Sequence, residues 1–179
     1  MKKLTKAVLC LASVALLGGC AKSVTVEEAA KIAGEYKVEN IKETSGKCKT
    51  NVKIEGEGSY LATVKNLLEM MGIEEGESEE EIKDPKLLMI TASYVAFISA
   101  STEKIEWKAD GTALSYSISD SSKETVMGVA LTTEEKTNAS YTSVGLPSSA
   151  SSTITYKFES STTNESFKVV ANASYSYSK

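Results

Sequence analysis

The chain has 179 residues, of which 41% are hydrophobic, and its formal net charge is −4. All twenty basic residues are lysine, and neither arginine nor histidine occurs in the sequence. Without arginine there is no planar group that holds phosphate bidentately, and without histidine the usual general base and metal ligand is missing. The composition therefore counts against most hydrolases, nucleotide enzymes and transition-metal sites, and the acidic charge disfavours nucleic acid as a partner.

The first twenty residues have the layout of an export signal. Lysines at positions 2, 3 and 6 precede an apolar run at 7–17 and small residues that end at Cys20. The sequence LGGC at 17–20 resembles the lipobox of bacterial lipoproteins, in which the cysteine carries diacylglycerol before the signal is cut. The resemblance implies lipidation of Cys20 and an anchor in the cell membrane or outer membrane, facing the extracytoplasmic side. The alternatives are an ordinary secretory signal with an incidental cysteine and a buried N-terminal helix.

This interpretation divides the chain into a signal peptide at 1–19, an acylated cysteine with a short linker at 20–24, and one domain at 25–179. The signal contains three of the twenty lysines, so the 160 residues that follow it have a net charge near −7. Membrane residence then depends on the tether, and two acyl chains suffice for stable anchoring. A linker of four residues reaches at most ~15 Å, so we expect the domain to lie close to the bilayer.

A short helix and two strands are expected at the start of the domain. Thr25 and Glu28 form a capping box that opens the helix, and Gly34 closes it. The segments 35–43 and 47–55 read as strands, and the second alternates apolar and polar residues in the manner of a strand with one solvated face.

Cys48 lies on the apolar side of the second strand. Cys10 leaves with the signal and Cys20 is the expected acylation site, so the sequence leaves no other cysteine for an intramolecular disulfide with Cys48. A reactive thiol or a disulfide between chains is one interpretation. We expect instead that Cys48 acts as a small buried apolar residue.

A core-facing amphipathic helix is expected at 59–71, ending at Gly72. The next segment, 74–84, contains seven acids and one lysine. It lacks the alternating Asp/Asn pattern with a central glycine that a calcium loop needs, so we expect a solvated loop or a helix start and assign no metal ligand.

The segment from Leu87 to Ala100 contains no charged residue. Asp84 and Pro85 suit a helix entrance, and the apolar spacing favours a helix, although the β-branched content leaves a strand open. A helix of this length spans ~21 Å, too short for a ~30 Å hydrocarbon core. We therefore expect the segment to fill the apolar face of a sheet, and a lid over a ligand there is the alternative.

From residue 103 onward the pattern predicts strands. Six are expected, at 103–109, 112–119, 124–132, 138–144, 152–159 and 167–178, with Asp110-Gly111 and Gly145-Leu146-Pro147 at bends. The predicted fold class is α+β, with an antiparallel β meander of about seven to eight strands in a half-barrel or open barrel. Two helices, at 59–71 and 87–100, are expected to cover one face.

This layout behind a lipobox resembles the half-barrel folds of bacterial lipoprotein carriers and related lipid-binding lipoproteins. The hairpin at 141–158 is similar to hairpins in such proteins, and AGEY at 33–36 is similar to the start of lipocalin-like barrels. The resemblance implies a lipid-binding role and carries over no binding residue. One departure is that lipoprotein carriers are soluble, whereas this chain is expected to be tethered. A small α+β sandwich with a filled core is the alternative.

Two functions fit these observations. The first is a non-enzymatic, membrane-anchored lipoprotein that binds a lipid or another apolar ligand. The second is a structural or protein-interaction lipoprotein, a scaffold or adhesin-like module with a filled core. No catalytic residue, metal or cofactor is assigned, because Cys48 as a nucleophile lacks a histidine base. The residues expected to line a ligand site are Tyr60, Leu68, Tyr94, Ile98, Trp107, Tyr116 and Tyr175.

Overall fold

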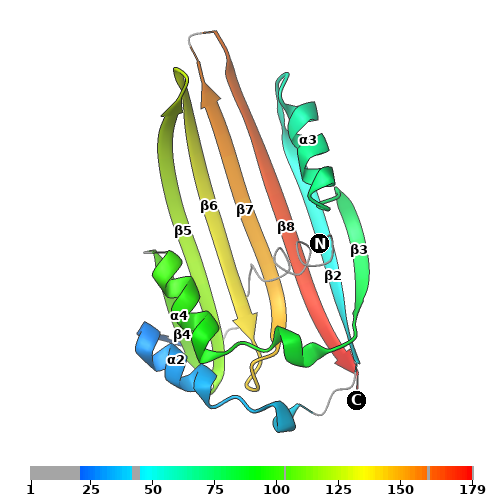
Figure 1. Cartoon of the computed structure of the whole chain (residues 1–179), viewed down its shortest axis with the longest axis vertical. Helices are drawn as coiled ribbons and strands as arrows, with labels where there is room; N and C mark the ends of the chain where they lie inside the picture. Colours follow the sequence, from blue (N-terminus) through cyan, green and yellow to red (C-terminus); the bar gives the residue numbers. More distant parts are fainter. Residues whose placement is uncertain (1–20, 42–44, 103, 161, 179) are drawn as a thin grey trace.

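The computed structural model describes residues 21–41, 45–102, 104–160 and 162–178. Within these residues eight strands form one open antiparallel sheet in the order β1-β4-β5-β6-β7-β8-β2-β3, accompanied by three α-helices (Figure 1). The strands are β1 (Lys22–Val24), β2 (Ser45–Glu57), β3 (Gly76–Ile82), β4 (Ile105–Asp110), β5 (Ala113–Val126), β6 (Val129–Tyr141), β7 (Pro147–Glu159) and β8 (Asn164–Ser178). The helices are α2 (Val26–Gly34), α3 (Leu61–Met70) and α4 (Ala92–Ser101), and two 3-10 turns are η1 (Val38–Asn40) and η2 (Pro85–Leu88). The predicted α+β class and open antiparallel meander are confirmed.

The strand register shows which side chains share a face of the sheet, because directly paired residues of antiparallel strands point the same way. One row of paired residues crosses all eight strands of the sheet: Val24, Trp107, Tyr116, Ala139, Ala150, Ala173, Thr50 and Ser78. We call the face that carries this row the inner face. The other face carries mainly serine, threonine, asparagine, lysine and glutamate. This division is the alternation of apolar and polar residues that the sequence predicts.

The helices α2 and α4 pack together over one part of the inner face. Val95 and Ile98 of α4 belong to the same buried cluster as Trp107 and Tyr116 of the sheet. The indole Nε1 of Trp107 donates to Ser99 Oγ at 3.0 Å, which fixes α4 over β4. Ala29 and Ala33 of α2 join this cluster as well. Within the described residues the sheet is therefore covered by three helices, one more than the two expected.

The helix α3 lies over a second cluster on the same face, toward the opposite end of the sheet from α2 (Figure 1). Its floor is formed by Val52, Ile54, Phe167 and Val169. The ring of Phe167 stacks on Tyr156 with centroids 5.0 Å apart. The inner face thus supports two separate apolar clusters, the α2/α4 cluster and the α3 cluster.

The uncharged segment from Leu87 to Ala100 contains a helix, as favoured, but the helix begins later than expected. Thr91 caps α4 through its Oγ1, which accepts from the backbone N–H of Tyr94 at 3.3 Å. Asp84 and Pro85 begin η2 instead, with the Asp84 carboxylate accepting from Lys86 N at 3.1 Å. The buried side chains of α4 fill the sheet's apolar face, so α4 packs as part of the core.

Two expectations about local structure are wrong. Residues 35–41 form no strand. The Tyr36 hydroxyl donates to Thr112 O at 2.5 Å, and the Tyr36 ring packs over Gly145, whose φ is +83°. These two contacts hold the segment at the turns that contain Thr112 and Gly145. Residues 42–44 of the expected strand lie outside the described residues. The acidic segment forms the edge strand β3, because it pairs along β2 and places Glu79 beside Lys47 at 2.7 Å.

The C-terminal half contains five strands, β4 to β8, where six were expected. The segment 124–132 is the tip of a long hairpin that turns at Met127 and Gly128, whose φ values are 51° and 80°. The bend at Gly145 is confirmed, since the turn 142–146 joins β6 to β7. At the N-terminus the Thr25–Glu28 capping box is confirmed, but most of the expected linker is strand β1.

Candidate functional site

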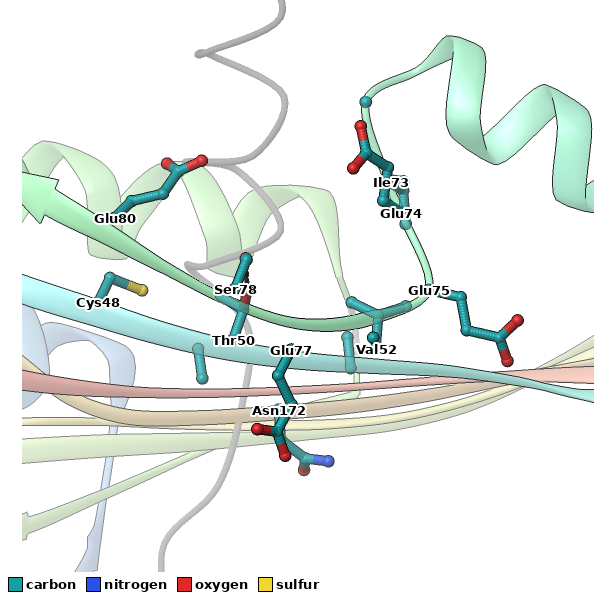
Figure 2. A pocket seen from close by; sticks show the side chains of 14 residues that line it. Cys48, Thr50, Val52, Ile73, Glu74, Glu75, Glu77, Ser78, Glu80 and Asn172 are labelled. Atoms are coloured by element: carbon teal, nitrogen blue, oxygen red, sulfur yellow. Dashed lines mark hydrogen bonds between the residues drawn. The ribbon is translucent and has the colours of Figure 1, made fainter.

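A cavity of about 100 Å³ lies on the inner face, where β2, β3 and β8 meet the connection 72–76 (Figure 2). Its floor comes from alternate residues of two paired strands, with Thr50 opposite Ala173 and Val52 opposite Ala171. The small alanine side chains leave room that a larger residue would fill. We call this cavity the inner pocket.

The connection 72–76 is held over β2 by specific contacts. Gly72 has a φ of +80° and lets α3 end in a tight turn, in which Ile73 N donates to Leu68 O at 2.8 Å. Glu75 accepts from the backbone N–H of Ile54 at 3.1 Å and from Lys65 Nζ at 2.8 Å. The hydrogen bond from Lys65 lowers the pKa of Glu75. Ile73, which is 7% exposed, is thereby fixed as part of the pocket lining.

The rim of the inner pocket is acidic, and its interior is mixed. Glu74 and Glu80 stand on the pocket side of the chain, whereas Glu77 and Asn172 point to the opposite face (Figure 2). Inside, Thr50 Oγ1 and Ser78 Oγ share a hydrogen bond of 2.6 Å. A ligand in the pocket would thus contact aliphatic side chains and two hydroxyl groups that are already hydrogen-bonded to each other. At the mouth of the pocket it would contact carboxylates.

A short line of polar side chains on β6 and β7 lies in the middle of the inner face and was missed by the sequence reasoning. Ser152 donates to Thr137 Oγ1 at 2.8 Å, and Thr137 donates to the Glu135 carboxylate at 2.8 Å. Thr137 is 1% exposed, so its hydroxyl depends on these partners. Period-two alternation places all three residues on the inner face, and this was the available signal.

Tyrosine hydroxyl groups cluster beside this polar line. Burial raises the pKa of Tyr116 and of Tyr141 well above the ordinary value of 10.0. Interactions among the hydroxyl groups of Tyr94, Tyr116 and Tyr141 also shift their pKa values. The charge of Glu135 adds to the increase at Tyr116. These tyrosines therefore remain neutral at physiological pH.

The seven residues expected to line a ligand site do not share one cavity. Ile98, Trp107 and Tyr116 are buried together in the α2/α4 cluster, and Tyr94 packs against them. Leu68 packs on the α3 cluster. Tyr60 is 56% exposed with its ring 6.3 Å from that of Phe158, and Tyr175 is half-buried on β8. Among the described residues that line the inner pocket, none belongs to the seven.

The cysteine expectations have different outcomes. Cys48 is 5% exposed and lines the inner pocket, which agrees with its predicted burial. Cys20 lies outside the described residues, so its lipidation stays a prediction.

The described residues contain no group of three or more acidic or cysteine side chains placed to hold a metal ion. They also contain no helix with the length and hydropathy needed to cross a bilayer.

Comparison with protein-family models, with curated proteins and with solved structures finds no match to this chain.

Proposed function

We propose that this protein is a non-enzymatic, membrane-anchored bacterial lipoprotein of the cell surface or periplasm that binds a lipid or another apolar ligand through the inner pocket. The observation that carries this proposal is the cavity itself. It lies on the apolar face of the sheet, beside the α3 cluster, and small side chains keep it open. Cavities with a few polar groups and an apolar floor are the usual places for small-ligand binding.

The volume of the inner pocket limits the ligand. A cavity of about 150 Å³ lined by aliphatic residues holds a molecule the size of benzene. The inner pocket, at about 100 Å³, is smaller. It suits a few methylene groups, such as one end of an acyl chain, or a branched aliphatic group, while the rest of the ligand remains outside.

The N-terminal sequence supports the anchored part of the proposal. The charged start, the apolar run and LGGC at 17–20 together have the form of a lipoprotein signal. Among the described residues the first element is β1, which begins two residues after Cys20, so an acyl group on Cys20 would hold the domain against the bilayer.

The inner pocket is tested by filling it. Leucine at position 173 would occupy the pocket from β8, and since Ala173 is half-buried the larger side chain has space to enter it. The matched control is Ser176→Leu, an exposed position on the outer face of the same strand. Native mass spectrometry of the acylated protein, extracted gently from membranes, should show a bound apolar molecule in the wild type and in Ser176→Leu, and none in Ala173→Leu.

A wild-type protein that carries no apolar molecule, and whose melting temperature does not change with added lipids, would contradict the proposed ligand.

The alternative is a protein-interaction lipoprotein, and the exposed side of α3 favours it. Leu67, Met70 and Met71 are 53%, 78% and 54% exposed, which leaves an apolar strip facing away from the sheet. Such strips often mark contact surfaces for other proteins.

A further inference from the structure

The start of the folded domain restricts where a lipid on Cys20 can lie. Lys22 pairs with Ala109, and Val24 pairs with Trp107, so β1 is part of the sheet from its first residue. Ala21 is the single residue between Cys20 and β1. Two Cα steps of 3.8 Å place the Cα atom of Cys20 within ~7 Å of that of Lys22. The polar headgroup layer on each side of a bilayer is ~5–7 Å thick, so Lys22 would lie at or beside it.

Lys22 lies near one particular end of the sheet. Its partner Ala109 directly precedes the β4–β5 turn at 110–112, and this turn is tied to the β6–β7 turn at 142–146 because Thr112 Oγ1 donates to Ser143 O at 3.0 Å. Tyr36 bonds to the first turn and packs its ring on the second. We call this end, formed by 110–112, 142–146, η1 and η2, the anchor end (Figure 1).

Two short turns at the anchor end expose an apolar residue next to a lysine. In η1, Val38 is 41% exposed and follows Lys37, directly after Tyr36. In η2, Leu87 is 82% exposed and follows Lys86. The chain after η2 is bound to the anchor end, since Ile90 N donates to Gly145 O at 2.9 Å.

This combination has the chemistry of a bilayer contact. Exposed aliphatic side chains gain from entering the interface, and lysines beside them gain from anionic headgroups. Glu39 and Asp84 lie near the two lysines, the Asp84 carboxylate is engaged in capping η2, and the exposed Asp110 also belongs to the anchor end. These acidic residues offset the lysines, so contact relies on the tether together with the two apolar side chains.

We infer that the anchor end is a membrane-contact surface, at which Val38 and Leu87 enter the headgroup region of a bilayer with Lys37 and Lys86 beside them. The inference rests on the proposed lipidation of Cys20 and adds an orientation to it. The sheet stands on the bilayer by its anchor end. The inner pocket and α3 then lie farther from the lipid, and the β5–β6 tip lies at the far end of the sheet (Figure 1).

The length of β5 makes the two ends easy to distinguish. From Ala113 at the anchor end to Val126 beside the tip there are thirteen steps of ~3.3 Å, or ~43 Å. Met127 at the tip is 100% exposed. It is therefore a matched control for Leu87, as an exposed apolar residue at the opposite end of the sheet.

The test uses the acylated full chain in vesicles of phosphatidylcholine and phosphatidylglycerol. A Cys48→Ser background leaves one thiol to label in each of two variants, Leu87→Cys and Met127→Cys, which carry the fluorophore NBD. Spin-labelled lipids should quench the probe at position 87 strongly and the probe at position 127 hardly at all. Reduction by added dithionite should be several-fold slower at 87. Circular dichroism establishes that both variants are folded.

Equal quenching at the two positions, or stronger quenching at 127, would overturn the inference while leaving the anchor intact. Recovery of the protein with the vesicles after a high-salt wash reports the anchor separately. A chain that carries no acyl group and is lost in that wash contradicts the proposed lipidation, and the inferred orientation with it. Recovery combined with strong quenching at 87 alone supports both.

Discussion

Buried hydroxyl groups on the inner face link individual residues to the stability of the protein. Tyr116 is 5% exposed and Tyr141 is 3% exposed, and burial keeps the pKa of both hydroxyl groups far above 10.0. In the unfolded chain a tyrosine titrates near pH 10. Folding therefore favours the protonated form of each residue.

We expect the free energy of unfolding to fall as the pH rises above 10. Below that pH both states hold the proton, so the stabilisation is fully present. Above it the unfolded chain loses the proton first, and the stabilisation is lost as the pH approaches the raised pKa of the folded state. Each buried tyrosine contributes at most ~1.4 kcal/mol per pH unit. Urea titrations between pH 8 and pH 11.5 measure the effect.

Substitution identifies the groups responsible for this pH dependence. Tyr116→Phe or Tyr141→Phe should reduce the slope of the unfolding free energy above pH 10. Tyr60→Phe is the control, because that residue is 56% exposed and should leave the slope as in the wild type. The same slope in all four proteins would show that the buried hydroxyl groups do not cause it.

The edge strand β3 shows how an element protects a sheet from association. All of its residues except Ile82 are exposed, and one side pairs with β2 while the other side faces away from the sheet. Glu77 and Glu79 occupy the outer face, where Glu79 binds Lys47 and Lys49 at 2.7 and 3.3 Å. Charged side chains on an edge strand oppose pairing with a second sheet.

Removing these charges should cause self-association. The triple variant Glu77→Thr, Glu79→Thr and Glu81→Thr keeps a good strand former at each position and leaves Glu80 as the one charged residue of β3. Light scattering of the detergent-solubilised protein should show dimers or larger species that grow with concentration. Thermal unfolding should change little, since exposed ion pairs contribute weakly to stability.

A matched control separates edge pairing from a general loss of charge. Glu55→Thr, Glu134→Thr and Glu159→Thr remove three glutamates from β2, β6 and β7, which have neighbours on both sides. We expect this variant to stay monomeric. If both variants associate to a similar extent, the net charge of the protein, and not the charges on the edge strand, prevents self-association.

Local sequence predicted elements well where the alternation was long, as in β2 and β8. It failed where one contact outside the element decided the structure. The residues after Gly34 are typical of a strand. The contacts of Tyr36 with Thr112 and Gly145 hold this segment at the β4–β5 and β6–β7 turns instead, where it forms no strand. The acidic segment has poor strand propensity, yet the lysines of β2 supply opposite charges across the pair. Pattern reasoning does not include partners that are distant in sequence.

At the scale of the whole molecule, the sheet carries two clusters of unequal depth. The α2/α4 cluster contains Val95 at 0% and Leu114 at 1% exposure. Among the described residues of α3, none is fully buried, and Leu68 only packs against its cluster. Regions with few buried apolar side chains open at lower free energy than the core.

The two halves should therefore differ in local stability. Hydrogen exchange should show lower protection for amides of α3 than for those of α4. Leu114→Ala should lower the global free energy of unfolding by about 2–5 kcal/mol. Leu68→Ala should mainly accelerate exchange in α3. Equal protection of α3 and α4 would contradict the division into two clusters.

The sequence by itself determined the α+β class, the open meander with one apolar face, the α2 capping box and the burial of Cys48. These follow from periodicity and local chemistry, which act within a few residues. Only the tertiary structure decided that α4 packs beside Trp107, that the expected ligand residues divide between two clusters, and that the pocket lies beneath residues 72–76. The physical reason is that a strand pattern fixes the face of a residue but not its neighbours across the sheet, and register and helix placement choose those neighbours.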